Sequence, residues 1–239
     1  MKKTVLETQG LTGGYGGGQV LNGVSFSLQA AEVLGLIGRN GAGKTTLMRT
    51  LIGAISPAGG KIVLDETDIT RAASQRRARL GIGYVPQGRE VFQGLTVKEN
   101  LQVGMQFVRE NRLYAGQLLE RVLEYFPILG QRLKQKAGTM SGGEQQQLAI
   151  ARALVGDPKV LLLDEPSEGV QPSIVHTIAD TLVRIASELD VAVILVEQDI
   201  AMIQRAAGRC AVMDKGQIVD ILSRQQLSCD QTLRQQLAL

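Results

Sequence analysis

The stretch that most constrains this chain is the run of nine residues from 38 to 46. It matches the phosphate-binding pattern G-x-x-x-x-G-K-[ST], in which a glycine loop joins a strand to a helix. The run consists of Gly38, Arg39, Asn40, Gly41, Ala42, Gly43, Lys44, Thr45 and Thr46. The apolar segment 33–37 before it is typical of a buried strand, and residues 44–53 carry apolar side chains at helical spacing. The sequence therefore predicts a phosphate-binding loop (P-loop) between a strand and a helix.

The composition of this loop suits the phosphates of a nucleoside triphosphate. Backbone N–H groups at a helix N-terminus favour a dense anion, and glycines let the backbone approach it closely. We expect Lys44 to contact the β- and γ-phosphates, Thr45 to join the coordination shell of Mg²⁺ and Thr46 to add a hydroxyl contact. The alternative is a glycine-rich turn that binds nothing, but a chance match in a chain of this length occurs in fewer than about one case in a hundred.

Two adjacent carboxylates follow a second apolar segment. Residues 160–163 are all apolar, and Asp164 and Glu165 come directly after them. In a P-loop protein, this position suits Asp164 to hold Mg²⁺ and Glu165 to orient or deprotonate the attacking water. A plain strand end is the alternative, and the presence of the P-loop makes it the weaker interpretation.

Three further positions suit a ligand site but also have plain structural explanations. Tyr15 lies among glycines, where its ring could stack on a base or sit in a turn with a solvated hydroxyl. Gln87 follows a predicted strand, where ligands of α/β sheets collect, although a solvated glutamine is the simpler interpretation of that position. A capping-box pattern before an amphipathic helix suits either a helix cap or a second anion site; it consists of Ser141, Gly142, Gly143 and Glu144.

The alternation of apolar strands with amphipathic helices predicts an α/β fold with a mainly parallel sheet flanked by helices. Residues 4–36 have the pattern of short antiparallel strands, whereas residues 97–136 are mostly helical after a capping box at 96–99. We therefore expect one domain, 1–239, that comprises a nucleotide-binding core with an antiparallel β subdomain (1–86 and 157–239) and a helical subdomain (87–156).

Charge and cysteine content restrict the partners and the compartment. Lys and Arg exceed Asp and Glu by 26 to 23, and a net charge of +3 is too small to indicate a nucleic-acid partner. No run approaches 18 apolar residues, and the start does not resemble a signal peptide. We expect a cytoplasmic chain in which Cys210 and Cys229 are packing residues and not a disulfide.

The order and spacing of these motifs resemble the nucleotide-binding subunit of an ATP-binding cassette (ABC) transporter over essentially the whole chain. The resemblance implies a P-loop NTPase cassette that hydrolyses ATP with Mg²⁺, with the P-loop as Walker A and Asp164 and Glu165 as the Walker B pair. It also implies that Tyr15 stacks on the base and that Gln87 touches Mg²⁺ and senses the membrane subunit. Residues 140–144 correspond to the signature motif.

The resemblance also implies partners. Such cassettes work as head-to-tail pairs, in which the P-loop of one chain and the signature helix of the other bind one ATP. The segments 85–92, 95–101 and 168–173 are similar to importers for branched-chain amino acids, other hydrophobic amino acids and urea, with the urea-type subunit as the closest match. That subgroup pairs two ATPase chains with two membrane permease subunits and an extracytoplasmic solute-binding protein.

This resemblance places the chain peripherally at the cytoplasmic face of the inner (plasma) membrane, with no nucleic-acid partner. The alternative is a soluble ABC ATPase of the iron–sulfur assembly type, which fits the chain length equally and would not be coupled to transport.

The chain departs from the common pattern at two places that bear on catalysis. Residues 167–170 lack the Asp that usually crosses the dimer interface, and Gln198 stands where a switch histidine is expected. A glutamine can hydrogen-bond a γ-phosphate but cannot carry a proton. The one histidine, His176, is expected on a helix surface, so Glu165 is left as the base and Gln198 as a phosphate contact.

Overall fold

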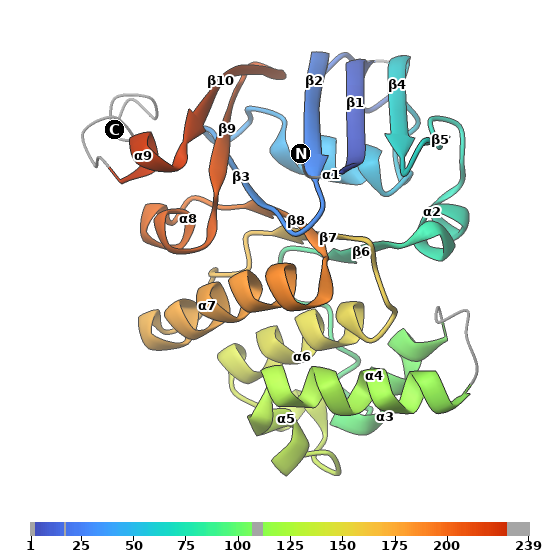
Figure 1. Ribbon diagram of the computed structural model, residues 1–239, viewed down its shortest axis with the longest axis vertical. Helices are drawn as coiled ribbons and strands as arrows, with labels where there is room; N and C mark the ends of the chain where they lie inside the picture. Colours follow the sequence, from blue (N-terminus) through green and yellow to red (C-terminus); the bar gives the residue numbers. More distant parts are fainter. Residues whose placement is uncertain (1–2, 17, 107–111, 229–239) are drawn as a thin grey trace.

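The computed structural model describes residues 3–16, 18–106 and 112–228, and a six-stranded sheet forms its centre (Figure 1). The strand order is β10-β9-β3-β8-β7-β6, in which the strands run parallel except β10, which pairs antiparallel with β9. The strands are β3 (Val33–Ile37), β6 (Ile82–Val85), β7 (Val160–Asp164), β8 (Ala192–Val196), β9 (Arg209–Asp214) and β10 (Gln217–Ser223). Every residue of β3, β7 and β8 is buried, as expected for parallel strands covered on both faces.

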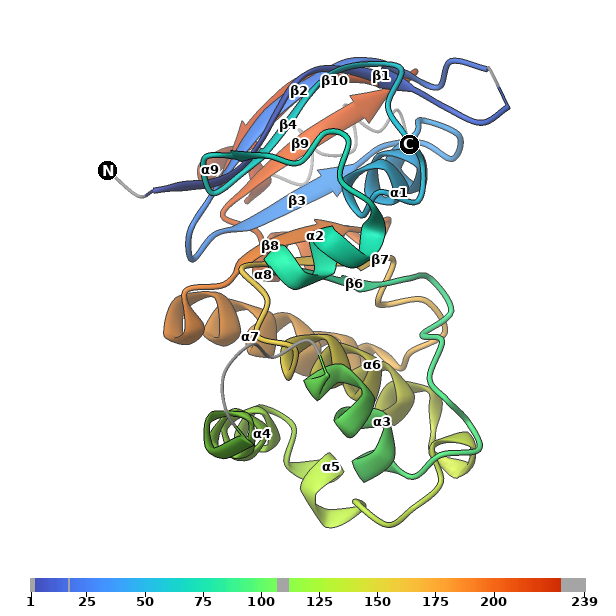
Figure 2. The same cartoon turned by 90° about the vertical axis from the view of Figure 1, so that its right-hand side faces the viewer.

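A second, antiparallel sheet covers one face of the central sheet (Figure 2). Its order is β2-β1-β4-β5, with β1 (Thr4–Gly13), β2 (Leu21–Gln29), β4 (Gly59–Leu64) and β5 (Thr67–Asp68). Helix α1 (Lys44–Leu51) packs with both sheets, because its Leu47 and Met48 share one hydrophobic core with Leu28 of β2 and Leu162 of β7. The P-loop helix is therefore held on two sides by apolar contacts.

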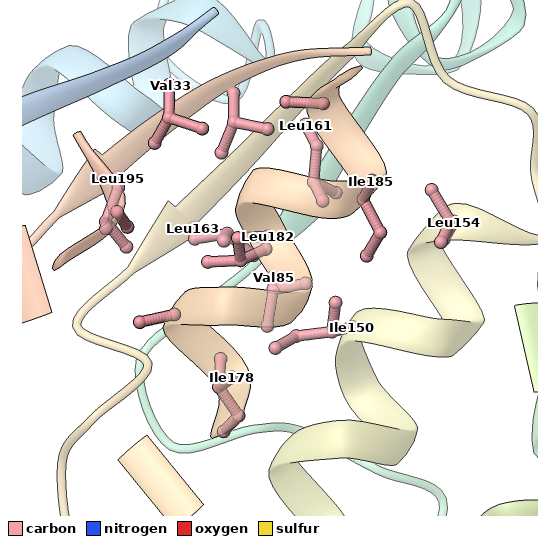
Figure 3. Packing of buried hydrophobic residues seen from close by; sticks show 14 of the residues in the cluster. Val33, Val85, Ile150, Leu154, Leu161, Leu163, Ile178, Leu182, Ile185 and Leu195 are labelled. Carbon is pink, nitrogen blue, oxygen red and sulfur yellow. The ribbon is translucent and has the colours of Figure 1, made fainter. Parts of the chain in front are cut away.

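Helices cover the other face of the central sheet. In Figure 3, side chains of β7 such as Leu163 face Leu182 of α7, and Ile150 of α6 lies beside α7. Helices α3, α4 and α5 continue below this layer in Figure 1, whereas α8 and α9 lie above α7, near β9 and β10. The helices on this side are α3 (Val97–Met105), α4 (Arg112–Tyr125), α5 (Pro127–Gln131), the 3₁₀ turn η1 (Ala137–Thr139), α6 (Gly142–Leu154), α7 (Pro172–Leu189), α8 (Ile200–Ala206) and α9 (Arg224–Leu227).

Several predictions of local structure are confirmed. Thr96 accepts a hydrogen bond from the Glu99 N–H at 3.2 Å, and the Glu99 carboxylate accepts one from the Thr96 N–H at 2.7 Å, which completes the predicted capping box. His176 is exposed on α7, and Cys210 is a buried packing residue whose thiol pKa is raised by burial to about 12. Cys229 lies outside the described residues. Within the described parts of the chain, no helix has the length and apolar character needed to cross a bilayer.

Helix α2 (Ser74–Leu80) was not predicted from the sequence, and its burial pattern gives the reason. Its one fully buried residue is Arg77, so the apolar periodicity that identifies most amphipathic helices is missing. The guanidinium donates to the carbonyls of Thr50 at 2.7 Å and Leu51 at 2.8 Å, at the end of α1. It also donates to the carbonyls of Thr70 and Ala72, both at 2.9 Å.

Arg77 therefore acts as a cap for the P-loop helix. The last carbonyls of a helix lack partners within the helix, and a positive charge there interacts favourably with the helix dipole. Burial lowers the pKa of the guanidinium, but arginine stays charged at physiological pH. One side chain thus joins α1, α2 and the segment that follows β5.

We predict that Arg77→Met lowers the free energy of unfolding by about 3 kcal/mol, because it leaves several buried carbonyl oxygens without donors. Urea unfolding followed by circular dichroism measures this change. The control is Arg76→Met on the same helix, whose side chain is exposed and whose loss should cost less than about 0.5 kcal/mol. Equal effects of the two substitutions would show that Arg77 is not a structural cap.

Candidate functional site

The P-loop and the polar residues after three strands meet at one edge of the central sheet. Strands β3, β8, β7 and β6 are neighbours and run parallel, so their carboxyl ends lie together. A cavity of about 650 Å³ opens there. It is lined by Val20, Asn40, Gly41, Ala42, Gly43, Lys44, Thr45, Thr46, Gln87, Glu165, Glu168 and Gln198. Most of the residues that the sequence nominated for phosphate and water chemistry therefore share one cavity.

The P-loop presents an uncapped helix end to this cavity. Gly43 is the N-cap of α1 with φ of 106°, a left-handed conformation that favours glycine, and no side chain bonds to the first N–H groups of the helix. Gly38 lies so close to the Met213 carbonyl oxygen that an added Cβ would be 2.2 Å from it. The first turn of α1 contains no acidic residue. Its N–H groups are therefore available to an anion.

Lys44 places a buried ammonium at the same point. The side chain is 6% exposed, and Nζ donates to the carbonyls of Gly38 at 2.7 Å and Arg39 at 3.2 Å. Burial lowers the pKa of the ammonium, while the charges of Glu165 and Asp164 act in the opposite direction. The positive charge has no ion pair within hydrogen-bonding distance among the described residues, which suits it to meet phosphate.

Asp164 is a buried carboxylate that is only partly satisfied. The residue is 1% exposed, and its Oδ2 accepts a long hydrogen bond of 3.4 Å from the Tyr84 hydroxyl. Its Oδ1 has no hydrogen-bond partner among the described residues. Burial raises the pKa of this carboxyl, and the Thr45 hydroxyl beside it acts in the opposite direction. A buried, unpaired carboxylate oxygen is costly unless a cation binds it, so Asp164 fits a metal ligand.

The other candidate ligands also fit Mg²⁺. This cation prefers oxygen atoms and usually completes its shell with phosphate oxygens and water, so it needs few protein ligands. Thr45 and Gln87 line the cavity and offer a hydroxyl and an amide oxygen. Across the described residues, no three His, Cys, Asp or Glu side chains group as a metal site. The phosphate of a bound nucleotide would therefore have to supply part of the shell.

Each carboxylate oxygen of Glu165 is contacted by a side-chain amide group. Gln198 Nε2 donates to Oε1 at 2.7 Å, and Gln87 Nε2 lies 3.4 Å from Oε2. The backbone of Glu165 is in the left-handed region with φ of 48°, and its N–H donates to the Val196 carbonyl at 2.9 Å. This unusual backbone, tied to the neighbouring strand, directs the carboxylate into the cavity.

Sequence reasoning missed Val20 and Glu168, which line the cavity, and also two residues that contact its surroundings, Tyr84 and Glu197. Tyr84 lies on β6, and its contact with Asp164 depends on the pairing of β6 with β7. Glu197 is 1% exposed and accepts hydrogen bonds from the backbone N–H and hydroxyl of Ser167, at 2.8 and 2.7 Å. The one available signal was the position of Glu197 directly after an apolar strand and before Gln198.

The predicted signature residues and Tyr15 do not line the cavity. Ser141 caps α6, and Glu144 closes the capping box and pairs with Arg132 at 3.1 Å. Tyr15 is 48% exposed, and its hydroxyl accepts a hydrogen bond from Arg49 at 3.3 Å. Within one chain, the residues predicted to contact the base and the second anion site therefore stand apart from the P-loop cavity.

Comparison with known proteins agrees with this geometry. The family described as ABC transporter matches residues 21–168. The chain is 45% identical over 205 residues to BraG of Pseudomonas aeruginosa, a high-affinity branched-chain amino acid transport ATP-binding protein, and the match covers 86% of this chain and 87% of BraG. It is 35% identical over 196 residues to LivF of Archaeoglobus fulgidus, a probable branched-chain amino acid transport ATP-binding protein, covering 82% of each. It is 33% identical over 211 residues to MetN of Caulobacter vibrioides, a methionine import ATP-binding protein, covering 86% of this chain and 62% of MetN.

Solved structures confirm the expected cassette fold. A nucleotide-free ATP-binding cassette of an ABC transporter superposes with a TM-score of 0.84 at 25% identity, covering 99% of this chain and 96% of the other. A cassette in its ADP conformation gives a TM-score of 0.84 at 26% identity and covers 97% of each chain. The chain therefore belongs to the ABC transporter family, as an ATP-binding subunit that hydrolyses ATP.

Proposed function

We propose that this chain binds ATP with Mg²⁺ in the P-loop cavity and that hydrolysis there drives the uptake of branched-chain or other hydrophobic amino acids through separate membrane permeases. The observation that carries the chemistry is the proximity of three groups: a buried ammonium without an ion pair among the described residues, a buried carboxylate with one unpartnered oxygen, and a second carboxylate that lines the cavity. These are Lys44, Asp164 and Glu165. The proposed substrate class is supported by the similarity to BraG and LivF, which are described as branched-chain amino acid transport ATP-binding proteins.

In this proposal, the phosphates occupy the N-terminal end of α1. Lys44 and the free N–H groups of the P-loop bind the β- and γ-phosphates, and Thr46 adds a hydroxyl contact. Mg²⁺, held by Thr45, Asp164 and Gln87, would neutralise charge on the phosphate oxygens. The exposed ring of Tyr15 would stack on the adenine base.

Glu165 is the proposed base. Its carboxylate faces the cavity and would take a proton from the attacking water, while Gln198 would donate its amide N–H to the γ-phosphate. In the present arrangement that amide bonds Glu165 instead. When a phosphate binds, the Gln198 amide would donate to a phosphate oxygen in place of Glu165 Oε1. This change would free that Glu165 oxygen to accept a hydrogen bond from the water.

A second cassette, identical or paralogous, is the proposed source of the signature-helix contacts to the γ-phosphate, which the cavity of one chain lacks. Ser141, Gly142 and Gly143 stand at the start of α6, outside the cavity of their own chain. A head-to-tail pair would bring this helix start onto the γ-phosphate in the other chain. Each ATP would then lie between two subunits.

An apolar groove offers a place for the permeases. It has a volume of about 420 Å³ and lies between α2, β6, α3 and α6, with the half-exposed ring of Phe92 at its edge. Arg152 lies 4.9 Å from the centroid of that ring. We propose that a cytoplasmic segment of one permease packs there, so that the chain is peripheral at the cytoplasmic face of the inner membrane. A solute-binding protein outside the membrane would deliver the substrate.

Uptake into vesicles tests this function. The chain is purified together with the membrane permeases and partner ATPase chain that co-purify with it, reconstituted with the solute-binding protein, and supplied with ATP on the cassette side. We expect ATP-dependent uptake of leucine, isoleucine or valine, and parallel assays with urea and methionine test the other substrates. Co-purification with a soluble iron–sulfur scaffold, without membrane proteins, would contradict the proposal.

Gln198 provides a separate prediction about the phosphate contact. Gln198→Ala should lower kcat by about 100-fold, because it removes a donor that tightens in the transition state. Gln198→His should preserve or raise the activity, since histidine offers a donor at similar reach. Steady-state phosphate release by the assembled transporter measures both. A silent Gln198→Ala would rule out a catalytic phosphate contact at this position.

A further inference from the structure

The turn 167–169 follows the Walker B pair and lies at the P-loop cavity. Charged side chains from two other loops bind this turn. Glu168 of this turn lines the cavity. On one side, the buried carboxylate of Glu197 accepts the Ser167 N–H at 2.8 Å and the Ser167 hydroxyl at 2.7 Å. It also accepts the N–H groups of Gln198 at 3.1 Å and Asp199 at 3.3 Å.

Arg89 binds the same turn through its carbonyl oxygens. Its Nη2 donates to the carbonyls of Glu168 and Gly169, both at 2.9 Å. The guanidinium also lies against Gly142 at the start of α6, where an added Cβ would be 2.9 Å from Arg89 Nη1. Arg89 thus touches the turn that lines this chain's cavity and the helix start that carries the signature motif.

The backbone at Arg89 is held in a strained conformation. Arg89 and the next residue, Glu90, both have positive φ, of 71° and 46°. The Glu90 carbonyl accepts a hydrogen bond from Arg152 at 2.8 Å. Non-glycine residues adopt this region only where the surroundings hold them, and such strain is typical of functional loops.

We propose that Arg89 and Glu197 are positioning residues that hold the turn 167–169 between them and so fix both amides on Glu165. Arg89 follows Gln87 by two residues, and Glu197 directly precedes Gln198. A shift of the turn would strain its bonds to Arg89 or Glu197, and the backbone next to each of these residues carries one of the two amides that contact the Glu165 carboxylate. The inference rests on the proposed role of Glu165 in ATP hydrolysis.

The charges of Arg89 and Glu197 are complementary to the backbone groups of the turn that each one binds. The cation binds carbonyl oxygens, and the anion binds N–H groups and a hydroxyl. Charge-assisted bonds of this kind are stronger than neutral ones. Because neither Arg89 nor Glu197 lines the cavity, their loss should affect the alignment of Glu165 more than the affinity for ATP.

The test combines kinetics with amide hydrogen exchange of residues 166–170. We expect Arg89→Met to lower kcat of the assembled transporter by about 10- to 100-fold, since small displacements of catalytic groups have effects of this size. The Kd for a non-hydrolysable ATP analogue should change by less than about 2-fold, because Arg89 does not line the cavity. Exchange at 166–170 should accelerate, and Arg89→Lys should recover part of both losses because an ammonium can still reach a carbonyl.

Two further variants complete the design. Ser167→Ala removes one bond to Glu197 with little risk to folding and should show a smaller kcat loss of the same kind. Arg205→Met is the matched control, because Arg205 forms two bonds with Asp180 on an exposed surface away from the cavity. It should leave kcat and the exchange at 166–170 unchanged.

Unchanged exchange at 166–170 in Arg89→Met would overturn the proposal, as would a loss of kcat that only parallels a loss of ATP affinity. The exchange measurement does not require hydrolysis. If the wild-type transporter did not hydrolyse ATP, the proposed function would fail, and the role of Arg89 in holding the turn would still be decided by exchange.

Discussion

Replacing Glu165 with Gln is expected to lower ATP turnover by about 1,000-fold, because the substitution removes the carboxylate that would take a proton from water. ATP binding should persist, since the proposed phosphate contacts of Lys44 and the proposed metal contacts of Asp164 would remain in place. Phosphate release measures the turnover, and equilibrium binding of a fluorescent ATP analogue measures the affinity. The loss should therefore appear in kcat alone.

The same variant should accumulate an ATP-bound pair of cassettes, since hydrolysis is what would separate them. Glu120→Gln on α4 is a suitable control, because it changes an exposed carboxylate outside the cavity and should hydrolyse ATP at the wild-type rate. Turnover by Glu165→Gln within a few-fold of wild type would contradict the assignment of Glu165 as the base.

Lys44→Ala should instead weaken ATP binding by about 100-fold, because hydrogen bonds to charged groups contribute a few kcal/mol when they are buried. In the proposed site, the ammonium would contact phosphate in both the ground state and the transition state, so its loss should act on affinity as well as rate. A fluorescent ATP analogue titrated against the variant measures the effect directly.

Lys61→Ala serves as the control for Lys44, because Lys61 lies on the exposed surface of β4 and makes a long ion pair of 3.9 Å with Asp68. Circular dichroism would confirm that both variants fold, since Lys44 also binds two loop carbonyls. An unchanged affinity in Lys44→Ala would mean that the P-loop cavity is not the nucleotide site.

The gathering of the catalytic candidates could be predicted from sequence because they share one kind of position. The P-loop, Gln87, Glu165 and Gln198 each follow an apolar strand, and parallel strands of one sheet end at the same edge. Their location therefore depends only on recognising the strands, which local apolar patterns reveal. The structure adds the distances that join Glu165 to both amides.

The contacts that lie behind the cavity could not be predicted, because they depend on how distant segments pack. The bonds of Arg89 span 79 and 80 residues, and that of Ser167 to Glu197 spans 30. No local pattern indicates such pairs. Helix α2 escaped prediction for a related reason: its buried residue is Arg77, and a charged side chain does not contribute to an apolar face.

Some sequence predictions extend beyond a single chain. Tyr15 and Ser141 are exposed and residues 142–144 are partly buried, and none of them lines the cavity. Their roles stay predictions that depend on assembly. In the proposed transporter, the choice between branched-chain amino acids and urea would depend on residues of the permeases and the solute-binding protein, because substrate and ATP would bind to different chains.

Uptake by vesicles that contain either the wild-type cassette or Glu165→Gln is the most direct test that ATP hydrolysis at this site drives import. Leucine uptake and phosphate release are measured in the same sample, with the partner ATPase chain, permeases and solute-binding protein held constant. We predict that the wild-type complex accumulates leucine only with ATP and that Glu165→Gln binds ATP but loses both activities. Uptake and phosphate release at wild-type rates in the variant would contradict the proposed function.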